Sequence, residues 1–198
     1  MSLDVVLVDG GGTNIGSVRS ALRRLGVDAP LTTDAARMRR ASHVILPGVG
    51  AAGPAMQRLA QLDLIDTLRN LRQPVLGVCL GLQLLFERSR ESASACLGII
   101  PAAVERLPAL PGLRVPHMGW NRLQIERPHA LLAGLDADAH AYFVHSYAAP
   151  VGAWTLASCT HGMSFSAIVQ KDNFFGMQFH PERSAAVGSL LLKNFLTL

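Results

Sequence analysis

The fold of this 198-residue chain is decided by the stretch Pro74-Val75-Leu76-Gly77-Val78-Cys79-Leu80-Gly81. Pro74–Val78 is a continuous apolar run, which is typical of a strand buried on both faces of a parallel sheet. Leu80–Arg88 then has the apolar content of a helix that begins without an intervening loop. A buried strand that passes directly into a helix indicates an α/β fold.

Two earlier segments have the same order of strand, glycine-containing turn and helix. Leu3–Asp9 is an apolar strand that ends at Gly10–Gly12, and apolar residues then recur at helical spacing over Asn14–Leu25. His43–Leu46 is a second short buried strand, and the apolar residues from Met56 to Leu68 predict the helix that follows it. Parallel strands connected by helices are therefore expected in the N-terminal half.

The C-terminal half contains short stretches of strand character, separated by turn-rich segments such as Pro108–Gly119 and closed by a predicted helix over Ser184–Leu196. Antiparallel pairing is expected there. We therefore expect one α/β domain over residues 1–198, with three layers, a mainly parallel mixed central sheet flanked by helices, and additional antiparallel strands in the C-terminal half. The predicted C-terminal strands are Arg122–Glu126, Ala141–Tyr147, Thr155–Thr160, Ser164–Gln170 and Phe174–Phe179.

The composition is that of a soluble, folded domain. Hydrophobic residues make up 49% of the chain, which at this length supplies a filled core and excludes disorder. The formal net charge is +4, and the charges are scattered apart from short groups such as Arg37, Arg39 and Arg40. We interpret those arginines as the solvated side of a helix, so nucleic-acid binding is not indicated.

The cysteines and the N-terminus predict a cytoplasmic location. Three cysteines are too few for a disulfide framework, and an odd number suits a reducing compartment. Asp4 and Asp9 bracket only Val5–Val8, which is too short an apolar run for a secretory signal. No apolar run approaches the roughly 20 residues of a membrane helix, so no membrane association is expected.

Cys79 stands between Gly77 and Gly81 at the junction of the predicted strand and helix, and this turn has the form of a nucleophile elbow. A nucleophile on such a tight turn takes a strained backbone conformation, and side chains two residues before and after it would collide unless both are glycine. The helix that follows favours thiolate, the reactive form of cysteine. We interpret Cys79 as a nucleophile; a buried structural cysteine between packing glycines is the alternative.

The segment Gln178–Glu182 offers the acid that a thiolate nucleophile needs. His180 and Glu182 are two residues apart, a spacing that puts both side chains on one face of an extended backbone. Pro181 favours that extended conformation at His180, so Glu182 is predicted to fix the imidazole tautomer. An ordinary strand-end histidine is the alternative for this motif alone, but the elbow favours a triad of Cys79, His180 and Glu182.

Acyl transfer also needs hydrogen-bond donors directed at the oxyanion. The backbone N–H of Leu80, directly after the nucleophile, is one candidate. The loop Pro47–Gly50 ends a neighbouring strand, and its glycines allow the peptides of Val49 and Gly50 to reorient as further donors. A simple turn is the alternative interpretation of this loop.

Two further patterns are weak. Gly10, Gly12 and Gly16 miss the dinucleotide-binding spacing by one residue, so a non-catalytic nucleotide-binding module is the less favoured interpretation of the chain. Cys159 with His161 is the only hint of metal-ligand spacing, and two ligands do not make a site. No metal site is predicted.

Together these motifs resemble the class I glutamine amidotransferases. The elbow, Pro47–Gly50 before it and Gln178–Glu182 after it match the family in order and separation over the whole chain. A narrower resemblance, to the members that serve a separate cyclase in histidine biosynthesis, is carried by Pro116–Asn121, Phe143–Tyr147 and Gly12–Val18.

The resemblance implies a glutaminase. In such enzymes the cysteine that Cys79 matches attacks the side-chain amide of glutamine, the histidine protonates the departing ammonia, and water hydrolyses the glutamyl thioester. The products are glutamate and ammonia, and no metal or organic cofactor is implied. Family members hold glutamine through positions that match Gly50, Gln83, Ser146 and Tyr147 here.

The resemblance also implies a heterodimer, in which a cyclase subunit with a (β/α)8 barrel receives the ammonia. Supply of ammonia to another acceptor synthase, of the pyridoxal phosphate or aminodeoxychorismate type, is the alternative, and the segment Pro116–Asn121 argues against it. The loop Gly10–Thr13 differs from the tyrosine-containing loop of the family. Positions expected to face the partner are Asn14, Trp120, Tyr142 and Arg183, the last standing where some relatives have lysine.

Overall fold

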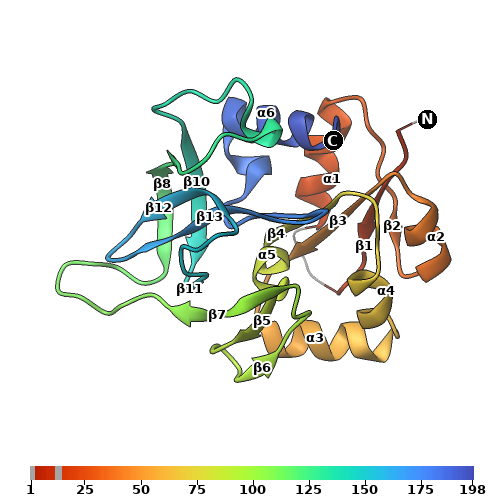
Figure 1. Ribbon diagram of the computed structural model, residues 1–198, viewed down its shortest axis with the longest axis horizontal. Coiled ribbons are helices and arrows are strands. Elements are labelled where there is room, and N and C mark those ends of the chain that lie inside the picture. Colours follow the sequence, from red (N-terminus) through yellow and green to blue (C-terminus); the bar gives the residue numbers. More distant parts are fainter. Residues whose placement is uncertain (1–2, 12–14) are drawn as a thin grey trace.

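A mixed sheet forms the centre of the fold (Figure 1). In the computed structural model, which describes residues 3–11 and 15–198, this sheet has eight strands in the order β2-β1-β3-β4-β14-β13-β12-β9. Their bounds are β1 Val5–Val8, β2 Leu31–Thr32, β3 His43–Gly48, β4 Val75–Cys79, β9 Gln124–Ile125, β12 Thr155–Thr160, β13 Ser164–Lys171 and β14 Phe174–Met177.

The sheet is parallel in one half and antiparallel in the other. From β2 to β14 each neighbouring pair is parallel, whereas β14 with β13, β13 with β12 and β12 with β9 are antiparallel pairs. The predicted change from parallel to antiparallel pairing is confirmed. The change occurs at β14, which pairs with β4 of the parallel half of the sheet and with β13 of the antiparallel half.

Helices cover both faces of the sheet because successive strand residues point to opposite sides. Val5 and Leu7 of β1 pack into one hydrophobic core with α1 and α6, whereas Val6 and Val8 pack into a second core with α2, α3, α4 and α5. Figure 1 shows these two layers, which confirm the predicted three-layer α/β fold. The helices are α1 Ile15–Arg24, α2 Ala35–Arg40, α3 Ala52–Gln61, α4 Ile65–Arg69, α5 Leu80–Leu84 and α6 Ala185–Phe195.

Two smaller sheets, of order β10-β8 and β11-β7-β5-β6, extend the fold beyond the central sheet. In the first of them Tyr142 of β10 pairs with Trp120 of β8. The remaining elements are β5 Phe86–Ser89, β6 Ser94–Ala95, β7 Ile100–Arg106, β8 His117–Arg122, β10 His140–His145, β11 Tyr147–Ala148 and the 3₁₀ turns η1 Ala130–Leu132 and η2 Pro181–Arg183.

Two predicted helices are wrong in extent. The helix expected between Met56 and Leu68 is divided into α3 and α4, because Asp63 has a left-handed φ of 52° that a helix does not accommodate. The helix expected over Leu80–Arg88 ends at Leu84, and the chain continues as β5, which pairs with β7 and buries Phe86. A short apolar run does not distinguish a buried strand from a buried helix.

Three boundaries in the C-terminal half also differ from prediction. β8 begins at His117, inside the predicted turn-rich segment Pro108–Gly119. The strand expected over Arg122–Glu126 is divided between β8 and β9, and the strand expected over Ala141–Tyr147 is divided between β10 and β11. The turns between these pairs lead the chain from one sheet to another.

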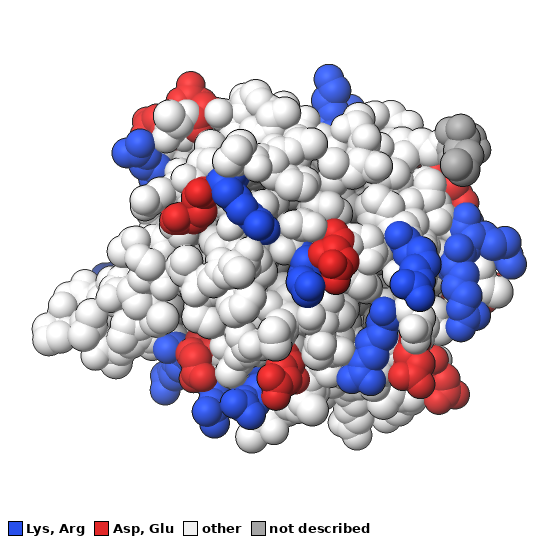
Figure 2. All heavy atoms as spheres, in the orientation of Figure 1, with Lys and Arg blue, Asp and Glu red and all other residues white. Residues whose placement is uncertain are grey.

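Charged side chains are spread over the surface, and on the face in Figure 2 basic and acidic groups lie among each other. The predicted arginine group lies on α2, where Arg37 forms a 2.5 Å ion pair with Asp4 and Arg39 donates to the hydroxyl of Thr67. Among the described residues, none of the helices has the length and apolar character needed to cross a bilayer.

α5 lies very close to β3 and β4, and glycines make this approach possible. A Cβ on Gly77 would lie 2.5 Å from the carbonyl group of Gly81, and a Cβ on Gly81 would overlap the carbonyl oxygen of Leu46 in β3. A Cβ on Gly48 would come to 2.9 Å from the Cβ of Leu80. The predicted steric need for glycine on both sides of Cys79 is therefore confirmed, and β3 adds to it.

Replacing Gly81 by alanine should destabilise the protein strongly, because backbone on both sides prevents relaxation around the new methyl group. We expect G81A to lose about 3 kcal/mol or more of unfolding free energy. Gly16 on α1 is the matched control, since a Cβ there meets nothing within 4 Å. G16A should leave stability unchanged or raise it by up to about 1 kcal/mol. Urea unfolding measures both, and similar midpoints for G81A and wild type would contradict the expectation.

Candidate functional site

Cys79 lies at the end of β4, in the sharp turn into α5. Its φ of 54° and ψ of −109° lie in a region that residues with a side chain rarely adopt, as expected for a nucleophile elbow. The residue is 8% exposed. Its sulfur lies 3.9 Å from the carbonyl oxygen of Val144 and 3.8 Å from Nε2 of Gln178. The backbone therefore presents the thiol in a defined direction.

His180 and Glu182 come from the segment that follows β14. His180 has an extended backbone, with φ −93° and ψ 98°, as predicted from Pro181. However, Pro181–Arg183 form the 3₁₀ turn η2, so Glu182 reaches the imidazole around a turn and not along one face of a strand. Nδ1 of His180 lies 3.0 Å from Oε1 of Glu182. The predicted pair is present, and its predicted geometry is wrong.

Strand pairing brings the thiol and the imidazole to the same edge of the sheet. β4 and β14 are parallel neighbours, with Val78 paired to Met177. Their carboxyl ends therefore coincide; Cys79 is the last residue of β4, and His180 follows β14 by three residues. Sites in open α/β sheets lie at such edges.

The turn that carries His180 is anchored to β10. The backbone N–H of His180 donates to the carbonyl oxygen of Tyr142 at 2.9 Å. The hydroxyl of Ser184 donates to the carbonyl of His180 at 2.8 Å and accepts from the N–H of Tyr142 at 2.9 Å. These bonds are made by buried groups, so they hold the imidazole in place.

The surroundings of His180 keep its imidazole protonated at neutral pH. Burial lowers the pKa of His180, but hydrogen bonds with Cys79 and Glu182, and the charges of both groups, outweigh burial and raise the pKa to about 10. The Glu182 side chain is only 2% exposed, so its charge is weakly screened by solvent. A protonated imidazole at this position can donate a proton to a leaving group.

Cys79 and His180 both line a pocket of about 200 Å³. This volume suits a ligand smaller than a drug-sized molecule, for which pockets of roughly 300–1,000 Å³ are usual. Gly50, which lines the pocket, has a φ of 92° that favours glycine. The predicted oxyanion and substrate residues all line it, and they are Val49, Gly50, Leu80, Gln83, Ser146 and Tyr147.

Gln178 is a residue of the site to which the sequence assigned no role. Its Nε2 faces the sulfur of Cys79, and its Oε1 accepts from Nε2 of Gln83 at 3.0 Å. Gln83 also donates to the carbonyl oxygen of Tyr147 at 2.9 Å. The position of Gln178, between the end of β14 and His180, was the available signal.

Glu91 and His145 also line the pocket without having been predicted. Glu91 follows β5, and its Oε2 accepts from the backbone N–H of Ala52 at 3.0 Å. A carboxylate at the pocket wall is suited to a cationic group of a ligand. His145 lies in Phe143–Tyr147, one of the stretches that carry the narrower resemblance, whereas the sequence offered no signal for Glu91.

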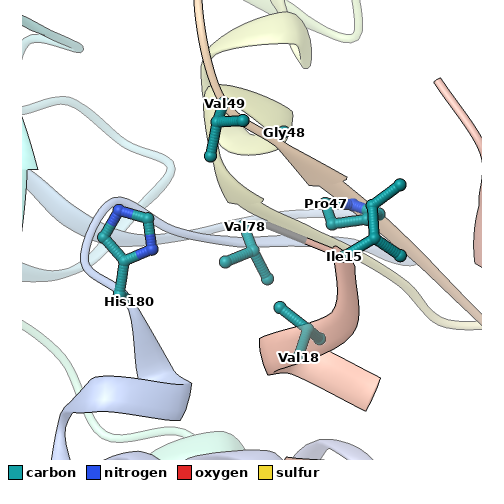
Figure 3. Close-up of a pocket in the computed structure, with 7 residues that line it drawn as sticks. All are labelled: Ile15, Val18, Pro47, Gly48, Val49, Val78 and His180. Atoms are coloured by element: carbon teal, nitrogen blue, oxygen red, sulfur yellow. The ribbon is translucent and has the colours of Figure 1, made fainter. Parts of the chain in front are cut away.

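A second, much smaller cavity of about 10 Å³ is also lined by His180 (Figure 3). Ile15 and Val18 of α1, Val49 and Val78 form its apolar wall. The volume corresponds to about one water-sized sphere. His180 and Val49 therefore border both the main pocket and this small apolar space.

Three of the predicted partner-facing residues form one cluster beside the site. Trp120 and Tyr142 are edge-to-face with ring centroids 5.9 Å apart, and the guanidinium of Arg183 lies 5.9 Å from the centre of the Tyr142 ring. Trp120 is 54% exposed. Asn14, the fourth predicted residue, lies outside the described residues, as do Gly12 and Thr13 of the N-terminal loop.

The other cysteines lie outside the pocket. Cys96 and Cys159 are buried free thiols. Burial raises the pKa of Cys96 to about 11 and that of Cys159 to about 12, so both stay protonated at neutral pH. Within the described ranges no group of three or more histidine, cysteine, aspartate or glutamate side chains is placed to hold a metal ion. Cys159 and His161 therefore belong to no such group.

Comparison with known proteins identifies a matching family and close relatives. The model of the family "Glutamine amidotransferase class-I" matches residues 6–198. A protein of Xanthomonas axonopodis pv. citri, named imidazole glycerol phosphate synthase subunit HisH, is 56% identical over 195 residues, which cover 98% of each chain. A protein of the same name from Xylella fastidiosa strain Temecula1 is 53% identical over the same share of each chain.

Solved structures of lower similarity share the fold. A chain in the structure of PurLQS from Thermotoga maritima is 17% identical with a TM-score of 0.73, over 100% of this chain and 99% of that one. The glutaminase domain of a Trypanosoma brucei CTPS, solved with bound acivicin, is 14% identical with a TM-score of 0.66, over 99% of this chain and 94% of that one.

Replacing Glu182 by glutamine keeps an acceptor for Nδ1 of His180 but removes the negative charge. Because the pKa of His180 is raised from 6.5 to about 10, the charged imidazole stabilises the fold fully below about pH 6.5, and this stabilisation is lost as the pH rises through about 10. The substitution should lower the pKa of His180. The unfolding free energy of E182Q should therefore fall less than that of wild type as the pH rises from about 6.5 to about 10. Urea unfolding at several pH values measures the difference, and equal losses in both proteins would rule out this role of Glu182.

Proposed function

The chain belongs to the class I glutamine amidotransferases, and we propose that it is the glutaminase subunit of imidazole glycerol phosphate synthase. It hydrolyses glutamine and supplies ammonia to a cyclase subunit in histidine biosynthesis. The observation that carries the chemistry is the arrangement of Cys79, His180 and Glu182 at one pocket. Full-length similarity to relatives of that name supports this acceptor over a pyridoxal phosphate or aminodeoxychorismate type of synthase.

The reaction proceeds in two acyl-transfer steps. The sulfur of Cys79 attacks the side-chain amide carbon of glutamine, and the carbon–nitrogen bond breaks as His180 donates its proton to the nitrogen, which leaves as ammonia. The imidazole, now neutral, removes a proton from water, which attacks the glutamyl thioester and releases glutamate. Glu182 holds Nδ1 throughout, which leaves Nε2 for these transfers.

The pocket residues divide into oxyanion donors and substrate contacts. The N–H of Leu80 and the peptides of Val49 and Gly50 stabilise the negative oxygen of each tetrahedral intermediate. The carboxylate of Glu91 is suited to the α-ammonium group of the amino-acid substrate. Gln83, Ser146 and Tyr147 line the remainder of the pocket and hold the substrate.

A cyclase subunit is the partner, and a (β/α)8 barrel is the fold that the resemblance implies for it. We place its docking face around Trp120, Tyr142 and Arg183, with Met118, which is 63% exposed, at its edge. Exposed aromatic and arginine side chains are the residues that contribute most to protein–protein binding. Arg183 follows Glu182 directly, so this face lies beside the site at which ammonia is released.

The remaining predictions concern organisation and location. We propose that residues 1–198 work as one domain, which the family match over residues 6–198 supports. We propose a cytoplasmic location, which suits the free thiols of Cys79, Cys96 and Cys159.

Replacing Cys79 by alanine should abolish glutamine hydrolysis in the complex with the cyclase subunit, since no other cysteine lies in the pocket. The loss should exceed about 10³-fold. Cyclase activity with added ammonium salt should persist, because the acceptor site belongs to the partner. Cys96, a buried thiol outside the pocket, is the control, and C96A should keep glutamine turnover. Persistent glutamine turnover in C79A would refute the proposed nucleophile.

Replacing Trp120 by alanine should weaken binding of the cyclase subunit by about 30-fold, which corresponds to roughly 2 kcal/mol. Calorimetric titration measures the affinity. Leu31, which is 40% exposed on the far edge strand β2, is the matched control, and L31A should bind as wild type does. Equal affinities for W120A and L31A would place the interface elsewhere.

A further inference from the structure

We propose that His117 and His145, which have no part in the acyl-transfer chemistry, are positioning residues for the nucleophile. They act through a chain of hydrogen bonds that begins on strand β8 and ends at the sulfur. This inference rests on the proposed function, because it concerns how the same thiol is oriented. The chain runs through Asn121, His117, His145, the carbonyl of Tyr147, Gln83, Gln178 and Cys79.

The first part of the chain links two buried imidazoles. Nδ2 of Asn121 lies 3.2 Å from Nε2 of His117, and Nδ1 of His117 lies 3.1 Å from Nε2 of His145. Nδ1 of His145 lies 2.9 Å from the carbonyl oxygen of Tyr147. Every ring nitrogen of the pair therefore has a partner within hydrogen-bonding distance.

The direction of each bond follows from the last one. A carbonyl oxygen only accepts, so Nδ1 of His145 carries the proton. In a neutral ring Nε2 is then an acceptor, so Nε2 of His145 accepts a hydrogen bond from the Nδ1–H of His117. Nε2 of His117 in turn accepts from the amide of Asn121. One tautomer at each histidine satisfies the whole series, with both rings protonated at Nδ1.

The second part of the hydrogen-bond series connects the Tyr147 carbonyl to the sulfur of Cys79. The carbonyl of Tyr147 accepts from His145 and also from Nε2 of Gln83, at 2.9 Å in both cases. Gln83 donates its other N–H to Oε1 of Gln178, at 3.0 Å, and Nε2 of Gln178 faces the sulfur of Cys79. The position of this carbonyl therefore sets two glutamine amides that would otherwise be free to rotate about their side-chain bonds.

The packing around His117 and His145 keeps both imidazole rings neutral and holds them in a fixed orientation. The ring of His117 stacks between Phe143 and His161, with centroid distances of 4.9 and 4.1 Å. Burial lowers the pKa of His117 to about 4, and burial also lowers that of His145, to about 3. Both rings therefore stay neutral at the pH of the cytoplasm, as the alternation of donors and acceptors requires.

Orientation of the sulfur matters because it must face the substrate carbon in the pocket while remaining beside His180. An N–H of Gln178 on one side of the sulfur limits rotation of the Cys79 side chain, and misplacement of a nucleophile by about 1 Å is sufficient to slow a reaction by about 10²-fold. The series of hydrogen bonds begins at Asn121 of β8, whose side chain points to the opposite side of the strand from that of Trp120.

Substitutions at His117 test the proposal, since His117 does not line the pocket and cannot act by touching substrate. H117F keeps an aromatic ring between Phe143 and His161 but removes the donor to His145. H117N keeps a donor at the position of Nδ1. We expect kcat for glutamine hydrolysis, measured with the cyclase subunit, to fall about tenfold in H117F and to recover to within about threefold of wild type in H117N.

H161F is the matched control, because His161 stacks on the same ring but donates to the carbonyl of Arg114 and is outside the chain. It should keep the wild-type kcat. Wild-type kcat in a folded H117F, or an H117N as slow as H117F, would overturn the proposal. Absence of turnover in wild type would instead refute the proposed function.

A measurement on the wild-type protein covers the case in which H117F does not fold. Nitrogen-15 spectra of labelled imidazoles distinguish the two neutral tautomers. We expect His117 and His145 to be neutral and protonated at Nδ1 between about pH 6 and 8. A neutral His145 with its proton on Nε2 would break the series at the Tyr147 carbonyl. Protonation of His145 in this range would set its Nε2–H against the Nδ1–H of His117, and protonation of His117 would set its Nε2–H against the amide of Asn121. Any of these results would overturn the proposal.

Discussion

The parallel pairing of β4 with β14 is the interaction on which the site depends. Its register places Val78 beside Met177, so the two strands end at the same edge of the sheet. Cys79 is the last residue of β4 and His180 follows β14, although about half of the chain separates them. No local interaction of either segment would hold these side chains together, so the catalytic pair exists only when the central sheet is complete.

The elbow concentrates strain at the nucleophile, and the surrounding packing supports it. Cys79 has a positive φ, which is unfavourable for a residue with a side chain. Gly77 and Gly81 let α5 lie against β3 and β4, where the buried side chains of Leu80 and Leu82 join the second hydrophobic core. Because the apolar packing stabilises α5 in this place, the thiol stays exposed to the pocket. Packing and function are thus coupled at one turn.

Much of this site was predictable because its signals are local. Steric conflict around Cys79 acts over two residues, so the glycines revealed the elbow, and the pairing of His180 with Glu182 followed from their spacing, although the turn between them is 3₁₀. The roles of Gln178 and Glu91 come from contacts with distant segments, so Glu91 was not predictable and the only signal for Gln178 was its position beside His180. The same reason explains β5, whose strand conformation depends on pairing with β7.

The most direct test of the catalytic account is covalent labelling by a glutamine-analogue electrophile, with the modified residue mapped by mass spectrometry. Cys79 lies in the pocket beside a protonated imidazole, whereas Cys96 and Cys159 are buried elsewhere as neutral thiols. We predict one adduct, on Cys79, whose formation excess glutamine slows. Labelling of Cys96 or Cys159 at the same rate, or no adduct on Cys79, would contradict the account.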